Sequence, residues 1–157
     1  MASRELKPGD KAPDVSLSSD RTGTISLSQL KGKSVVLYFY PKDDTSGCTA
    51  EAIAFSKDSK AFKTAGAVIL GVSKDSPESH DKFKAKHGLQ LMLGSDEDTN
   101  TAQAYGVWVE KSMYGRRYMG MERATFLIDG KGIIREIWRK VKVPGHAEEV
   151  LAAVKAL

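Results

Sequence analysis

The chain has 157 residues, with 24 Lys and Arg against 20 Asp and Glu, a formal net charge of +4 and one cysteine. This length suits a single domain over residues 1–157, and one cysteine excludes an internal disulfide. No stretch approaches the roughly 20 apolar residues of a membrane span, and residues 1–13 contain no apolar leader, so we expect a cytoplasmic protein without membrane contact.

The charges indicate no nucleic-acid partner. The densest basic stretch, IIREIWRKVKV at residues 133–143, has the alternation of a strand with one solvated face, and no nucleic-acid-binding motif accompanies it. Glycine-rich phosphate loops are also missing, which argues against a nucleotide cofactor.

Short strands and helices alternate along the chain, as is typical of an α/β domain. Residues 15–17 and 24–27 alternate apolar and polar side chains around a turn sequence, which predicts a peripheral hairpin. Residues 34–40 are apolar nearly throughout, so they predict a central strand covered on both faces, which Pro41 ends because it has no N–H to donate.

The remaining elements follow from periodicity and from capping residues. A helix is expected from near Gly47 to about Phe62, and Asp129-Gly130 predicts a hairpin between strands at 124–128 and 132–138. The other expected elements are a strand at 67–73, a helix at 76–87, a strand at 91–93 and helices at 99–105 and 146–157. The sheet is therefore expected to be mixed, with antiparallel last strands and helices on both sides.

The single thiol, Cys48, falls in the first turn of the helix that follows the central strand. Ligand sites of open α/β sheets form at such strand ends, and a helix start stabilises a thiolate over a thiol. Thr45 precedes Cys48 by three residues, so a helical turn there would place its hydroxyl beside the sulfur. A site for an anionic sulfur nucleophile is indicated, against the alternative of a merely packed cysteine.

Three segments resemble a known family. FYPKDDTSGCTAEA at 39–52 resembles the active-site segment of peroxiredoxins, whose pattern of Pro, three residues, Thr or Ser, two residues and Cys is matched by Pro41, Thr45 and Cys48. The segments YGVWVEKSMYGRRYMG at 105–120 and MERATFLIDGKG at 121–132 resemble the peroxiredoxin Q or bacterioferritin comigratory protein branch. That branch carries an active-site arginine at the position of Arg123.

The resemblance implies a thioredoxin-like α/β fold, with a mixed central sheet flanked by helices and an N-terminal β-hairpin extension. It implies a thiol-dependent peroxidase that reduces hydrogen peroxide and organic hydroperoxides through a sulfenic acid on Cys48. Thr45 would orient peroxide and sulfur, and Arg123 would stabilise the thiolate and the transition state. Pro41 and Gly47 would complete the substrate site. No cofactor and no metal are expected.

The chain departs from this branch at its second thiol. Members often carry a resolving cysteine five residues after the first, or in the following helix around position 84, where this chain has Ile53 and Lys84. The resemblance then implies an external thiol reductant, which could be thioredoxin, glutaredoxin or a small thiol. A monomer is expected, with a weak homodimer as the alternative.

The sequence bears on two other functions. A thiol–disulfide oxidoreductase needs C-x-x-C, and position 45 is Thr. The alternative from another class is a non-catalytic thioredoxin-fold module, acting as a holdase or in redox signalling.

The remaining polar clusters predict structural roles. His80, His87 and His146 are expected to be exposed on helices rather than to bind a metal, and the acidic runs at 43–44 and 96–98 are expected to act in turns and caps. Three large side chains are expected in the core rather than at the rim of a pocket: Tyr105, Trp108 and Met113.

Overall fold

The computed structural model describes residues 5–19 and 23–157. Its main sheet has the strand order β2-β1-β5-β4-β3-β8-β9. The strands of this sheet are β1 (Leu17–Ser19), β2 (Thr24–Ile25), β3 (Ser34–Phe39), β4 (Ala67–Ser73), β5 (Met92–Ser95), β8 (Ala124–Ile128) and β9 (Ile134–Trp138). β3, β4 and β5 run parallel, whereas β8 is antiparallel to both β3 and β9, so the predicted mixed sheet is confirmed.

β3 is the central strand that the apolar run predicts. It pairs with β4 on one side and with β8 on the other, and residues 35–40 are each at most 2% exposed. Successive side chains enter opposite cores, because strand residues alternate between the two faces. Leu37 and Phe39 pack into one core, and Val36 and Tyr38 into the other.

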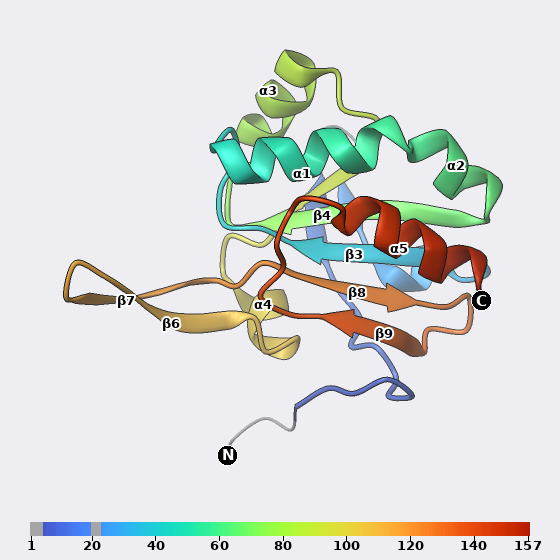
Figure 1. Ribbon diagram of the computed structural model, residues 1–157. Coiled ribbons are helices and arrows are strands. Elements are labelled where there is room, and N and C mark those ends of the chain that lie inside the picture. The colour runs from blue at the N-terminus through green and yellow to red at the C-terminus, as the bar shows by residue number, and fades with distance from the viewer. Residues whose placement is uncertain (1–4, 20–22) are drawn as a thin grey trace.

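The helices cover the two faces unequally (Figure 1). Four of them lie over one face of the sheet: α1 (Ser46–Lys57), α2 (Ser59–Thr64), α3 (Pro77–His87) and α5 (His146–Lys155). The other face carries α4 (Asn100–Ala104). A 3-10 turn, η1 (Leu27–Leu30), lies near the N-terminal end. Among the described residues, no helix has both the length and the apolar character needed to cross a bilayer.

One predicted helix is in fact two. The stretch from Gly47 to Phe62 breaks at Asp58, whose N–H donates to the carbonyl of Phe55 at 3.2 Å in a tighter turn. Asp and Ser compete for backbone hydrogen bonds and favour helix ends, and Asp58 is followed by Ser59. Phe55 and Phe62 nevertheless reach the same core.

The predicted N-terminal hairpin is present at one edge of the main sheet. β1 pairs with β2 and also, antiparallel, with β5, so it extends the main sheet. Part of its turn, at 20–22, lies outside the described residues.

A second hairpin, β6 (Trp108–Met113) with β7 (Arg116–Met121), was not predicted. It projects from the body of the sheet (Figure 1), and its turn places both Tyr114 (φ 52°) and Gly115 (φ 79°) in the left-handed region, as in type I′ hairpins. The expectation for the core holds in part: Tyr105 is buried and Trp108 packs partly buried against the core, whereas Met113 is 57% exposed.

Candidate active site

Cys48 lies in the first turn of α1, directly beyond the carboxyl end of β3, and is 1% exposed. The helix starts after Thr45, whose backbone is extended (φ −88°, ψ 156°) and whose carbonyl accepts the N–H of Thr49 at 2.8 Å. The first N–H groups of a helix have no partner within it, so they remain available near the sulfur. The predicted position of the thiol at a helix start is confirmed.

Arg123, in the short link between β7 and β8, contacts the sulfur. Its Nη2 donates to Cys48 Sγ at 3.4 Å, and its Nη1 donates to Glu51 Oε1 at 2.7 Å. A Cβ at position 47 would lie 3.1 Å from Arg123 Nη2, so Gly47 leaves the space that the guanidinium occupies. Cys48 and Arg123 are 75 positions apart in the chain, and the pairing of β3 with β8 brings them together.

Glu51 is a site residue that the sequence analysis did not assign. It is 1% exposed, and its Oε2 has no hydrogen-bond partner among the described residues. Burial raises the pKa of Glu51 to about 7, although Arg123 acts in the opposite direction. Its spacing of three residues from Cys48 on one helix was the signal that could have revealed it.

Arg123 keeps its charge in this site. Burial opposes the charge, but the attraction of Glu51 and Cys48 outweighs burial and raises the pKa of Arg123. Beneath the pair, burial raises the pKa of Tyr38 well above its usual value, and Glu51 and Cys48 add to the effect. The side chain of Tyr38 therefore stays neutral beside the site, and Arg123 is the permanent cation of the site.

The spacing of Thr45 and Cys48 would suit a helical turn, but Thr45 itself is not helical. It is the extended residue before α1, it is exposed, and its Oγ1 donates to the carbonyl of Lys42 at 2.9 Å. That bond uses the hydroxyl proton and leaves the oxygen lone pairs. Pro41 is half-buried at the start of the same loop.

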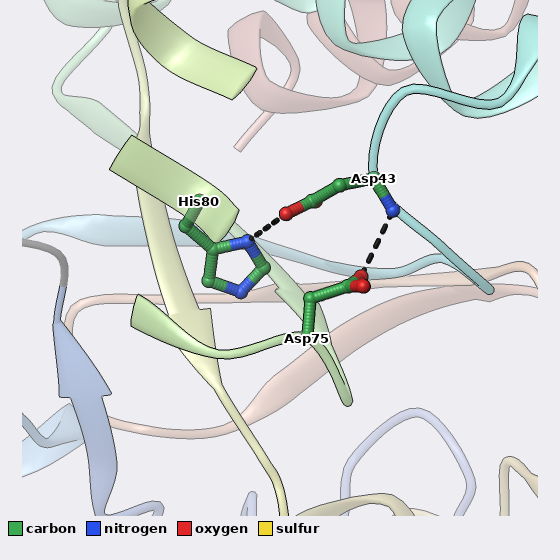
Figure 2. A group of neighbouring side chains, drawn as sticks. All are labelled: Asp43, Asp75 and His80. Carbon is green, nitrogen blue, oxygen red and sulfur yellow. Dashed lines mark hydrogen bonds and ion pairs between the residues drawn. The ribbon is translucent and has the colours of Figure 1, made fainter. Parts of the chain in front are cut away.

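The loop between β3 and α1 is fastened to α3 by a buried polar cluster (Figure 2). Asp43 Oδ2 lies 2.7 Å from His80 Nδ1, and the N–H of Asp43 donates to Asp75 Oδ2 at 2.9 Å. The hydroxyls of Tyr40 and Ser79 also donate to Asp43. The cluster therefore holds the backbone that enters the helix of Cys48.

Two of the three histidine expectations are wrong. His80 is 0% exposed and His146 is 5% exposed, because each has a buried polar partner: Asp43 for His80, and Thr125 Oγ1 at 2.8 Å for His146. His87 is partly exposed and pairs with Asp44. Helical periodicity alone did not show that loops and strands bring partners to these rings.

Asp43 is likewise more than a turn residue, since it is buried among these partners. At the other acidic stretch the expected cap is observed: Asp96 accepts the N–H groups of Thr101 and Ala102 at the start of α4. One atom each from Asp43, Asp75 and His80 lies within 4.8 Å of the others, a spacing that a metal ion would accept. Hydrogen bonds within the cluster already occupy these atoms.

The thioredoxin-like sheet and the thiol–guanidinium pair place this protein among the cysteine-dependent peroxidases. The model of the AhpC/TSA family matches residues 8–137. The chain therefore belongs to the AhpC/TSA family.

Similar proteins agree with this assignment. The peroxiredoxin Bcp of Bacillus subtilis is 50% identical over 150 residues, which cover 96% of each chain. A putative peroxiredoxin Bcp of Coxiella burnetii is 49% identical over 146 residues, 93% of this chain and 97% of the other. The structure of the Xanthomonas campestris bacterioferritin comigratory protein, studied for alkyl peroxide reduction, is similar with a TM-score of 0.86 at 47% identity over 90% of each chain.

These relatives confirm three expectations: the thioredoxin-like fold, the resemblance to the peroxiredoxin Q or Bcp branch, and the activity of a thiol-dependent peroxidase. A non-catalytic holdase or signalling module is not favoured.

Proposed function

We propose that Cys48 is the peroxide-reducing nucleophile and that Arg123 is the fixed charge that serves it. The observation that carries this proposal is the guanidinium bridge, in which Arg123 donates to Cys48 Sγ at 3.4 Å and to Glu51 at 2.7 Å. The Arg123 side chain is 18% exposed, and a cation so largely buried stabilises a thiolate far better than a cation in water does.

The reaction transfers one oxygen atom. The Cys48 thiolate attacks the terminal oxygen of the peroxide, the S–O bond forms and the O–O bond breaks. Sulfur is oxidised by two electrons to a sulfenic acid, while the leaving oxygen takes up a proton and departs as water or an alcohol. Donors aimed at the leaving oxygen, where charge develops, lower this barrier most.

Arg123, the hydroxyl of Thr45 and the backbone N–H of Gly47 are the proposed donors or orienting groups for the peroxide. Thr45 already donates to Lys42, so it would act through its lone pairs or after turning from that carbonyl. Pro41 would shield the sulfur from water. The neutral form of Glu51, populated near neutral pH, leaves the charge of Arg123 to the sulfur and the peroxide.

The substrates proposed are hydrogen peroxide and organic hydroperoxides, and the alkyl peroxide reduction studied in the Xanthomonas protein supports the second class. The chain has one cysteine, so regeneration of Cys48 calls for an external thiol such as thioredoxin, glutaredoxin or a small thiol. We further infer a monomer acting as one domain in the cytoplasm, where thiols are kept reduced.

The test is Cys48→Ser. Serine is not ionised at neutral pH, so peroxide consumption with any thiol donor should be abolished, while circular dichroism should show an intact fold. Consumption at the wild-type rate in this variant would refute the assignment of the nucleophile.

A further inference from the structure

The β6–β7 hairpin holds most of the exposed apolar groups of the described chain. Among the described residues, six large hydrophobic side chains are exposed. Four of the six belong to this hairpin: Met113 (57%), Tyr114 (98%), Tyr118 (44%) and Met119 (50%). The hairpin projects from the main sheet (Figure 1). Apolar groups gathered on such an exposed element mark an interaction surface.

The hairpin has two chemically different faces, because residues directly opposite in an antiparallel pair share a side. One face, called here the site face, has apolar side chains with two cations and no acid: Lys111, Met113, Arg116 and Tyr118. The opposite face includes a carboxylate: Glu110, Ser112, Arg117 and Met119. On the opposite face, Arg117 and Glu110 form an exposed ion pair at 3.6 Å. On the site face, Lys111 lies opposite Tyr118 and Arg116 lies opposite Met113, so neither cation has an acidic residue as its cross-strand partner.

The site face belongs in part to β7, the strand that precedes Arg123. The stem of Lys111 lies on Gly120, where an added Cβ would be 3.0 Å from Lys111 Cδ. Burial lowers the pKa of Lys111, repulsion by Arg123 lowers it further and attraction to Cys48 opposes both. Lys111 is thus within electrostatic range of the reacting pair, and β7 ends at Met121, two residues before Arg123, which donates to Cys48 Sγ.

We propose that the site face is the docking surface for an acidic dithiol protein that reduces the oxidised Cys48. This inference rests on the proposed function, which requires an external thiol. Two cations flanking apolar side chains fit a partner whose reactive thiol is surrounded by apolar groups with an acidic rim. A second copy of this chain is a poor occupant, because symmetric pairing would bring the same cations together and each chain carries a net +4.

The chemistry needs such docking. The first thiol of the partner attacks the sulfenic sulfur of Cys48, which forms a mixed disulfide and releases water. The second thiol of the partner then attacks the partner's own sulfur, which leaves Cys48 as a thiol and the partner oxidised to a disulfide. Binding beside a sulfur that is 1% exposed keeps the partner's thiol at high effective concentration while the first turn of α1 opens.

Arg116→Glu and Arg117→Glu form a matched pair, because both change the net charge equally but alter opposite faces. With a negatively charged thioredoxin as the probe, Arg116→Glu should raise the KM for thioredoxin about tenfold, and Arg117→Glu should change it less than about twofold. Tyr118→Ser and Met119→Ser repeat the comparison without a charge change. Turnover with dithiothreitol should be the same in all four variants.

Three results would overturn the docking surface: equal effects of the two arginine variants, an unchanged KM for thioredoxin in Arg116→Glu, or an equal loss with dithiothreitol. Binding to phosphatidylglycerol vesicles that Arg116→Glu abolishes, with no effect on thioredoxin, would overturn it too and assign the surface to an anionic membrane. Oxidation of Cys48 by peroxide in a single turnover without reductant tests the proposed function separately. If peroxide does not oxidise Cys48 in the wild type, the proposed function is refuted. If Cys48 is oxidised but the KM for thioredoxin is unchanged in Arg116→Glu, only the docking surface is refuted.

Discussion

The guanidinium of Arg123 donates to two acidic groups, the thiol of Cys48 and the carboxyl of Glu51, each of which forms an anion when it loses its proton. One cation in a largely buried site cannot fully stabilise two negative charges, and burial of the carboxyl opposes its ionisation. The raised pKa of Glu51 follows from this arrangement. Ionised Glu51 therefore competes with the thiolate for Arg123.

Glu51 should make stability depend on pH. Its pKa rises from 4.5 in the unfolded chain to about 7 in the fold, so over this range the folded state holds a proton that the unfolded state releases. The free energy of unfolding should then fall as the pH rises, by up to about 3 kcal/mol. Glu51→Gln should lack this component. Urea unfolding of both proteins from about pH 5 to about pH 8 measures it, and parallel profiles would contradict it.

Thr45 tests the proposed role of a hydroxyl. Thr45→Val keeps the shape and removes the oxygen, so peroxide-dependent turnover should fall by about 10², whereas Thr45→Ser should remain near wild type. Valine also loses the bond to the Lys42 carbonyl, so thermal unfolding must be measured alongside. Equal activity of the valine and serine variants would show that Thr45 is structural.

At the scale of elements, the loop before α1 depends on α3. Asp43 is buried and accepts from Tyr40 and Ser79, and His80 faces oxygen acceptors on both ring nitrogens: Asp43 at 2.7 Å and the Gly94 carbonyl at 3.2 Å. The neighbouring Asp44 instead forms exposed pairs with Lys86 and His87.

Adjacent carboxylates therefore allow a matched comparison. Asp43→Asn replaces one of two buried carboxylate oxygens by an amide nitrogen, which cannot accept a hydrogen bond, and should lower the free energy of unfolding by about 1–3 kcal/mol. Asp44→Asn should change stability little, since its partners are in water. Denaturant unfolding gives both values, and peroxide turnover should also fall in the Asp43 variant. Equal stability of the two variants would show that the cluster does not fasten the loop.

At the scale of the whole molecule, the single thiol determines the oxidised product. After one equivalent of peroxide, intact-mass measurement of the monomer should show one added oxygen and no loss of two hydrogens. Excess peroxide should add further oxygens and inactivate the enzyme. A monomer that loses two mass units without added oxygen would contradict the single-cysteine mechanism, and non-reducing electrophoresis identifies any Cys48 dimer.

Ile53→Cys is the control for that measurement. Ile53 is 44% exposed while Cys48 is 1% exposed, and five residues along a helix turn the side chain by about 140°. An internal disulfide therefore requires the first turns of α1 to unwind. If those turns open, this variant should lose two mass units on oxidation and resist excess peroxide.

The sequence alone predicted most of the sheet and the position of the thiol. The apolar run of β3, the bounds of β4 and the Ser76 cap of α3 are local signals, in which a residue's neighbours along the chain decide its conformation. The motif around Cys48 belongs to the same class, since a strand end, a proline and a helix start lie within a few residues. The β6–β7 hairpin is mostly exposed and has no continuous apolar run, so local signals do not predict it.

Only the tertiary structure decided which distant groups meet. Arg123 reaches Cys48 because β8 pairs with β3, and Asp43 meets His80 because α3 packs over the loop before α1. The burial that turns Glu51 into a weak acid depends on side chains from several elements at once. Local periodicity does not encode these contacts, because a buried polar residue has the same sequence pattern as an exposed one until its partner is known.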